Sequence, residues 1–339
     1  MPKPLHAALL LSGLLASPAL AHPGHDSETT TGQTATTSQI NGRLASEVEI
    51  EVRGGYRYIT SNGIPDHEPG RFPNRGNPNR ITEQSYRYRM PTNPEANDEP
   101  TAMRGVIGVA LNGVPMDPGT AEFWDPDGRN SRSRDRSSGW NYDALSGKIN
   151  LGLDDSNAHV QPTGAYHYHG LPVGLIELRQ EAQTEPAMVL VGYAGDGFPM
   201  YASVAHDDAE EADSPLVPMK PSYRLKEGDR PGGNNAPGGR YDGTFVQDWE
   251  YVAGLGDLDE CNGRFGVTPE YPDGTYYYML TDSYPFIPRY YRGTPDRSFI
   301  RRSPGGADNA GDRPRGPRDA GPRQGPPPGE RPDGPPPRR

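Results

Sequence analysis

The stretch GAYHYHGLP, from Gly164 to Pro172, holds the best candidate for chemistry in this chain. Aromatic residues bounded by Gly164 on one side and by Gly170 and Pro172 on the other are typical of a short strand. Successive side chains of a strand point to opposite faces, so His167 and His169 are expected to share one face. Their Cα atoms would lie about 6.5 Å apart, close enough for both imidazoles to bind one metal ion if a third ligand comes from elsewhere.

The best candidate for that third ligand is His159, eight residues upstream of His167 and separated from the strand by a predicted turn at Gln161–Thr163. The chain has only eight histidines, and three of them fall between positions 159 and 169. Asp154 and Asp155 lie in the same loop and are predicted as additional ligands or as acceptors that orient the rings. We therefore predict a metal site here.

Three imidazoles suit zinc, copper or iron, and zinc or copper is the prediction that we carry forward. A set of three histidines leaves a fourth position open, as in catalytic zinc sites. The alternative is that the histidines are hydrogen-bonded in a polar core. His67, in the long loop Ser61–Ile81, is a weaker metal candidate, because a loop histidine more often caps backbone groups. The sequence leaves open whether the centre is catalytic, and it identifies no catalytic residue.

Composition excludes several classes of function. The net charge of −11 argues against a nucleic-acid partner. The single cysteine, Cys261, cannot form an intramolecular disulfide and is expected to be a buried thiol. Motifs of serine hydrolases, zinc proteases and nucleotide-binding proteins do not occur. Glu122 beside Trp124 is a weak pointer to a glycosidase, which needs two opposed carboxylates. The competing hypothesis is a non-catalytic β-rich module that binds a cell-envelope partner or a polysaccharide.

The N-terminus predicts export. Residues 1–21 read as a signal peptide, with Lys3, an apolar run and a small-residue cleavage site after Ala21. The apolar run is too short to span a bilayer, and we predict a periplasmic or secreted protein without a transmembrane segment. Residues 22–43 are predicted to be a flexible linker, which argues against a copper site at the new N-terminal residue, His22. The proline-, glycine- and arginine-rich residues 301–339 are predicted to be a disordered tail.

The sequence of residues 44–300 predicts one mostly β domain with an internal repeat. Alternating Val48, Ile50 and Val52 indicate a strand that Gly54-Gly55 turns into a hairpin, and Leu175–Gln183 holds the one helical pattern. The repeat halves are placed at about 104–172 and 188–290, with turns at Asn112-Gly113 and Asp196-Gly197. Three motifs recur in the same order: GVALNGVPM (108–116) as GYAGDGFPM (192–200), LDDSN (153–157) as LDECN (258–262), and GAYHYH (164–169) as GTYYYM (274–279). Because the second copy has no histidines in its last motif, the strand can form without them.

The same motifs carry a resemblance to a known family. The chain resembles the YHYH domain family, named after the tetrapeptide at 166–169, from about Ser61 to Phe299. The stretches that carry the resemblance are SNGIPDH, LNGVPMDPGTAEFWD, LDDSNAHVQPTGAYHYHGLP, GYAGDGFPMY and the long segment from Tyr241 to Arg289. The resemblance implies an exported bacterial protein but no particular reaction, so the site has to be argued from its own residues.

Overall fold

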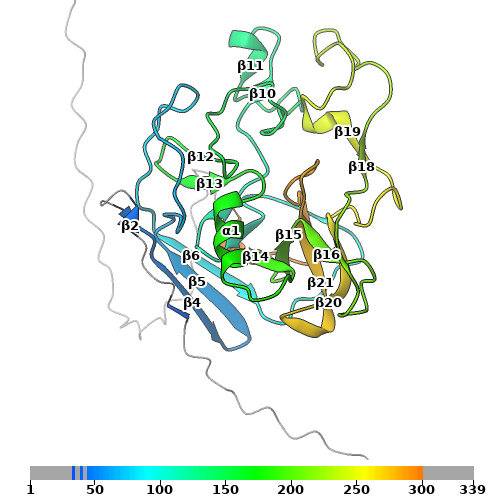
Figure 1. Ribbon diagram of the computed structural model, residues 1–339. Helices are drawn as coiled ribbons and strands as arrows, with labels where there is room; N and C mark the ends of the chain where they lie inside the picture. Colours follow the sequence, from blue (N-terminus) through cyan, green and yellow to red (C-terminus); the bar gives the residue numbers. More distant parts are fainter. Residues whose placement is uncertain (1–32, 35–38, 41–43, 301–339) are drawn as a thin grey trace, which may run out of the picture. The chain divides into compact units, whose positions relative to one another are not determined.

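The strand predicted around the histidines is present as β13 (Tyr166–Tyr168) in the computed structural model, where it belongs to an eight-stranded sheet (Figure 1). The structure describes residues 33–34, 39–40 and 44–300. The predicted signal peptide (1–21), the tail (301–339) and most of the linker, including His22, lie outside the described residues. Within the linker range, β1 (Gln33–Thr34) pairs with β4 (Val48–Arg53), and β2 (Gln39–Ile40) pairs with β3 (Leu44–Ala45).

The eight-stranded sheet is built around two adjacent hairpins, β8–β9 and β14–β15. Gly113 and Gly197 turn these hairpins with positive φ angles of 76° and 100°, as the turn predictions at Asn112-Gly113 and Asp196-Gly197 require. In spatial order, the strands are β12 (Ala158–Val160), β13, β9 (Pro115–Met116), β8 (Gly108–Ala110), β14 (Val189–Ala194), β15 (Pro199–Ala202), β21 (Tyr271–Leu280) and β20 (Gly263–Thr268).

On both sides of the two central hairpins, the added strands follow the same pattern of parallel and antiparallel pairing. Each hairpin adds a parallel strand, with Tyr168 opposite Met116 on one side and Tyr278 opposite Met200 on the other. An antiparallel strand, β12 or β20, then closes each edge. These pairings agree with the predicted repeat, which stays a prediction until the two halves are superposed.

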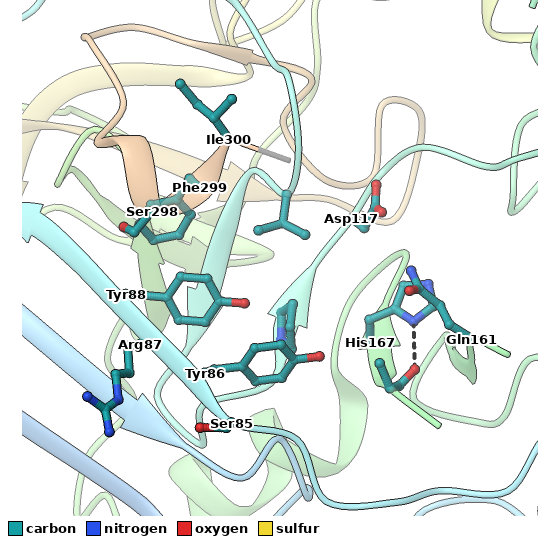
Figure 2. Close-up of a pocket in the computed structure, with 13 residues that line it drawn as sticks. Ser85, Tyr86, Arg87, Tyr88, Asp117, Gln161, His167, Ser298, Phe299 and Ile300 are labelled. Carbon is teal, nitrogen blue, oxygen red and sulfur yellow. Dashed lines mark hydrogen bonds between the residues drawn. The ribbon is translucent and has the colours of Figure 1, made fainter. Parts of the chain in front are cut away.

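A second sheet contains β4 (Val48–Arg53), β5 (Tyr56–Ser61) and β6 (Tyr86–Pro91). The predicted hairpin is correct, with Gly54 and Gly55 at positive φ in its turn. Beside β6 lies a cavity of about 360 Å³ (Figure 2). Tyr88 and Phe299 line one side of it, and His167 lines the other.

The only α-helix among the described residues, α1 (Val173–Glu181), begins directly after Pro172, two residues before the predicted start. Its Leu175 is buried. The described part is mostly β, as predicted, and none of its helices is long and apolar enough to cross a membrane. The remaining elements are β3 (Leu44–Ala45), β7 (Thr101–Ala102), β10 (Phe123–Trp124), β11 (Arg132–Ser133), β16 (Val204–His206), β17 (Leu216–Pro218), β18 (Tyr223–Leu225), β19 (Trp249–Tyr251), β22 (Tyr290–Tyr291), and the 3-10 helices η1 (Arg129–Ser131), η2 (Val246–Asp248) and η3 (Arg297–Phe299).

The two faces of β13 have different surroundings. Tyr166 and Tyr168 point into the main hydrophobic core, together with Met116 and Leu175. The loop from residue 62 to 85 is bonded to this part of the sheet, since Asn77 donates a hydrogen bond to the Val160 carbonyl. Because side chains alternate along a strand, the histidines of the same strand point to the opposite face.

Candidate metal centre

A tight hairpin formed by β12 and β13 brings two of the three histidines together. His159 and His167 are direct cross-strand partners in this antiparallel pair. The connecting turn is closed by the Gly164 amide, which donates to the Gln161 carbonyl at 2.8 Å. Gly164 has a φ of +85°, a conformation that glycine adopts without strain. The predicted turn is therefore correct, and it fixes the register that pairs the imidazoles.

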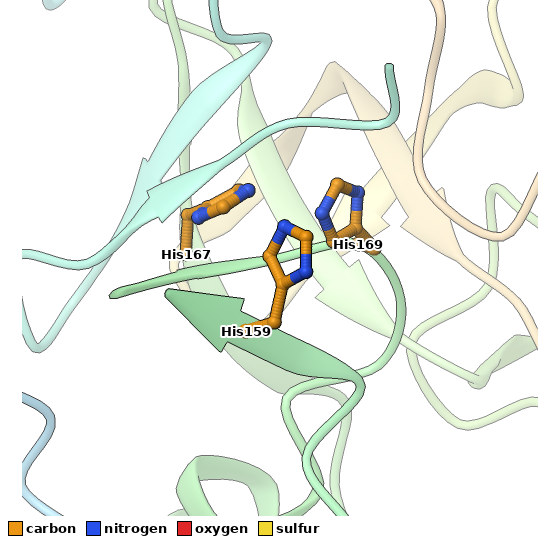
Figure 3. A group of neighbouring side chains, drawn as sticks. All are labelled: His159, His167 and His169. Atoms are coloured by element: carbon orange, nitrogen blue, oxygen red, sulfur yellow. The ribbon is translucent and has the colours of Figure 1, made fainter. Parts of the chain in front are cut away.

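The three imidazoles form a nearly equilateral triangle (Figure 3). The ring centroids are 4.7 Å apart for His159 and His167, 4.7 Å for His159 and His169, and 4.6 Å for His167 and His169. One nitrogen from each ring lies within 4.8 Å of the others. A tetrahedral zinc ion with bonds of about 2.0–2.1 Å holds its nitrogens about 3.4 Å apart. Rotation of the rings and a shift of about 1 Å would complete such a geometry.

Backbone carbonyls orient two of the rings. Nδ1 of His159 lies 3.0 Å from the Leu151 carbonyl, and Nδ1 of His167 lies 3.3 Å from the Ala165 carbonyl. A carbonyl oxygen only accepts hydrogen bonds, so each Nδ1 is the protonated nitrogen and each Nε2 carries a lone pair. Metal-binding histidines characteristically donate their second nitrogen to a carbonyl or carboxylate in this way.

The third ring, His169, is buried without a hydrogen-bond partner. Its side chain is only 3% exposed, and neither ring nitrogen makes a hydrogen bond of good geometry within the described residues, although the Asp117 backbone lies near enough to act on its pKa. A neutral imidazole has one donor and one acceptor, and leaving a buried polar group unpaired costs about 1–3 kcal/mol. Buried polar groups are paired in most proteins, so His169 points to a partner that is not a protein side chain.

Burial favours the neutral form of two of the three rings, His159 and His169. Burial lowers the pKa of His159, although the carbonyl of Leu151 and the charge of Glu122 act in the opposite direction. Burial lowers the pKa of His169 still further, and His167, His159 and Arg289 reinforce the effect, while the Asp117 backbone acts in the opposite direction. Neutral imidazole is the form that binds a metal ion.

The structure does not bring the predicted carboxylates to the cluster. Asp154 lies on the tyrosine face, where its Oδ2 accepts hydrogen bonds from the Tyr166 hydroxyl at 2.7 Å and from the Gly70 amide at 3.0 Å. Its Oδ1 accepts from the amides of Ser156 and Ala158. These four bonds occupy the carboxylate of Asp154, and it is not among the side chains that converge at the cluster. Asp155 is exposed in the same loop and does not belong to the group of converging side chains.

His67 also lies on the tyrosine face. Its Nδ1 donates to the Glu68 carbonyl at 3.2 Å, which leaves Nε2 to accept a 2.7 Å hydrogen bond from the Tyr168 hydroxyl. Strand β13 therefore separates His67 from the cluster. His67 is not among the converging side chains, and both of its ring nitrogens have hydrogen-bond partners, as in the alternative of a loop histidine with structural bonds.

Asp117 is a residue near the cluster that sequence reasoning missed. It directly follows Met116 of β9, which lies opposite Tyr168 in the parallel pair, so Asp117 points to the histidine face. It is 5% exposed, it lines the cavity together with His167, and its charge acts on His159. The available signal was its position after a buried strand, but the sequence does not show that this strand pairs with β13.

The second half of the sheet has different residues at the corresponding positions. Arg264 and Tyr277 are cross-strand partners there, as His159 and His167 are in the first half. The Arg264 guanidinium donates to the Tyr277 hydroxyl at 2.6 Å. Cys261, in the same half, is buried as predicted, and burial raises the pKa of its thiol.

The chain was compared with known protein families, curated proteins and solved structures. A family model described as YHYH protein matches residues 87–293, a range that includes the three histidines and Asp117. No curated protein and no solved structure matches the chain.

Proposed function

We propose that this chain, which belongs to the YHYH protein family, binds one transition-metal ion, zinc or copper, through His159, His167 and His169. The observation that carries the proposal is His169, whose two buried ring nitrogens have no partner in the described part of the chain although its ring completes a triangle with two others. A purely structural role would supply hydrogen bonds to this ring. A metal ion supplies the missing interaction.

The donor set supports the choice of metal. Imidazole nitrogens suit zinc, copper, iron and nickel, whereas magnesium and calcium prefer oxygen ligands. With three protein ligands, a bound zinc ion would keep one position for water or a substrate, as in catalytic sites. Such an ion would supply a Lewis acid, while the carbonyls of Leu151 and Ala165 hold His159 and His167 in the tautomers that bind it.

The proposal includes an exported protein. Residues 1–21 have the features of a cleavable signal, with cleavage after Ala21 and release into the periplasm or outside the cell. Residues 44–300 would then be the functional domain, between a linker and a proline- and arginine-rich tail.

The test is the metal content of the purified protein. The protein should be prepared without a histidine tag or chelator, with His22 and His25 replaced by glutamine so that the N-terminus contributes no metal. We expect about one zinc or copper ion per chain. A triple variant, His159→Arg, His167→Tyr and His169→Met, copies the residues of the second half and should fold without binding metal.

A matched control separates the cluster from histidine content in general. His206 lies outside the cluster, and its Nδ1 donates to the Ser214 carbonyl at 2.9 Å. His206→Gln should retain the full metal content. Equal metal in the triple variant and the unchanged protein, or none in either after incubation with zinc and copper, would refute the proposal. The second outcome would favour the alternative of a non-catalytic module that binds a cell-envelope partner or polysaccharide.

A further inference from the structure

The cavity beside the histidine cluster lies where a substrate of the centre would bind. Its volume of about 360 Å³ is at the lower end of the range for small-molecule sites. Its walls come from β6, β9, the β12–β13 turn and η3, and His167 is the ring of the cluster that reaches it. We propose that this cavity is the substrate pocket of the metal centre and that it takes a small hydroxylated aromatic compound, an inference that rests on the proposed function.

One wall of the cavity is a column of aromatic rings. Tyr86 stacks on Tyr88 with centroids 5.5 Å apart, and Tyr88 stacks on Phe299 at 4.8 Å, both with an interplanar angle of 28°. The ring faces cover one another, so the column presents ring edges to the cavity, and Figure 2 shows the hydroxyl groups of Tyr86 and Tyr88 on these edges. The C–H edges carry partial positive charge and attract the negative face of another aromatic ring, and the hydroxyl groups can hydrogen-bond to polar groups of a ligand. The wall therefore favours an aromatic ligand.

The opposite wall selects the polar group of the ligand. Figure 2 shows Tyr86 and Tyr88 projecting from β6 toward the side where Asp117 and His167 lie. A carboxylate such as Asp117 repels an anionic ligand and accepts hydrogen bonds from a hydroxyl group. Arg87 also lines the cavity, but it is exposed, and its guanidinium points away from Asp117 in Figure 2. A neutral phenol or catechol fits this arrangement better than an aromatic acid.

These two walls define how the ligand is oriented. The aromatic ring lies against the edges of the tyrosine column, one hydroxyl donates to Asp117, and a ligand oxygen reaches the open coordination position beside His167. The ligand and the metal are then held by different residues, so ligand binding can be removed while the metal stays.

The experiment uses the full-length protein loaded with cobalt(II), whose visible absorption reports on the ligands of a histidine site. Catechol is titrated into the cobalt protein, with benzoate and cis-1,2-cyclohexanediol as matched ligands that change the charge or remove the aromatic ring. Ser85 is exposed at the cavity wall. Ser85→Trp fills the cavity from this position, and Ser85→Ala is the control. Ser298→Trp closes it from η3 if Ser85→Trp does not fold.

We expect catechol to shift the cobalt spectrum with saturation, and the tryptophan variant to weaken this binding at least tenfold without changing the spectrum of the ligand-free protein. Ser85→Ala should behave like the unchanged protein. Cobalt bound with no response to catechol overturns the pocket and leaves the metal site intact. An equal response in Ser85→Trp overturns the location, and equal binding of benzoate or of the saturated diol overturns the ligand class. Failure to bind cobalt, together with no uptake of zinc or copper, refutes the proposed function itself.

Discussion

Replacing His169 by methionine should stabilise the metal-free protein and remove its response to metal. Methionine is the residue that the second half has at the corresponding position, Met279. In the metal-free protein the two buried, unpartnered nitrogens of His169 cost about 2–6 kcal/mol together. Refitting an apolar side chain of similar size costs less than about 1.5 kcal/mol. We expect His169→Met to gain about 0.5–4.5 kcal/mol in free energy of unfolding when a chelator is present.

Adding the metal should stabilise the unchanged protein but not the variant, and so reduce or reverse the difference in stability between them. An ion at a hundred times its dissociation constant stabilises a protein that binds it by about 2.7 kcal/mol, and the variant should gain little of this. The assay is urea unfolding followed by tryptophan fluorescence, with EDTA and with zinc or copper. His206→Met is the control, because His206 already has a carbonyl partner and should lose stability equally under both conditions. A variant that is less stable in EDTA, with both proteins indifferent to metal, would show that His169 is an ordinary core residue.

Three further predictions concern residues around the site and its counterpart. Asp154→Ala should lower the free energy of unfolding by about 3 kcal/mol or more in urea, because it removes four hydrogen bonds. The folded variant should keep its metal, and loss of the metal would show that Asp154 belongs to the site. Gly164→Ala, at φ +85° and against Thr82, should destabilise the protein by about 1–3 kcal/mol and weaken metal binding, whereas Gly147→Ala, at φ +71° in open space, should leave the metal affinity unchanged. Burial raises the pKa of Asp196 to about 6, so the native state holds a proton that the unfolded chain releases near pH 4. The protonated Asp196 contributes about 3 kcal/mol of stability, which is full below about pH 4 and is lost as the pH rises through 6. The variant Asp196→Asn should flatten this part of the curve of stability against pH.

The sequence predicted the local structure of the site well. Alternation along β13 placed His167 and His169 on one face, and the spacing of His159 across a turn placed it opposite His167. Both features depend on residues within ten positions of one another and on the period of a strand, which local sequence reports directly. The tyrosines of the same strand point to the opposite face, as the same alternation requires.

Features that depend on distant segments were not predictable in this way. Asp117 reaches the cluster only because β9 pairs in parallel with β13, some fifty residues later in the chain. His67 is on the tyrosine face because a long loop without regular structure is bonded to that face. The position of Asp154 in LDDSN fits a ligand loop and also a turn, where an aspartate accepts hydrogen bonds from following amides, and in the structure Asp154 accepts such bonds.

The resemblance between the halves separates what the fold needs from what the site adds. The Tyr166 hydroxyl bonds to Asp154 at 2.7 Å, and the Tyr276 hydroxyl bonds to Asp259 at 2.9 Å, so the aspartate and the tyrosine shared by the repeated motifs have the same structural task. The histidine positions differ in all three cases, and the replacements form a bonded Arg–Tyr pair and a buried methionine. Because the second half forms the same strand pairs without histidines, the needs of the sheet do not explain why three histidines converge in the first half. They also do not explain why His169 lacks a well-formed hydrogen bond. Binding of a ligand explains both, and metal chemistry is what three imidazoles at this spacing support best.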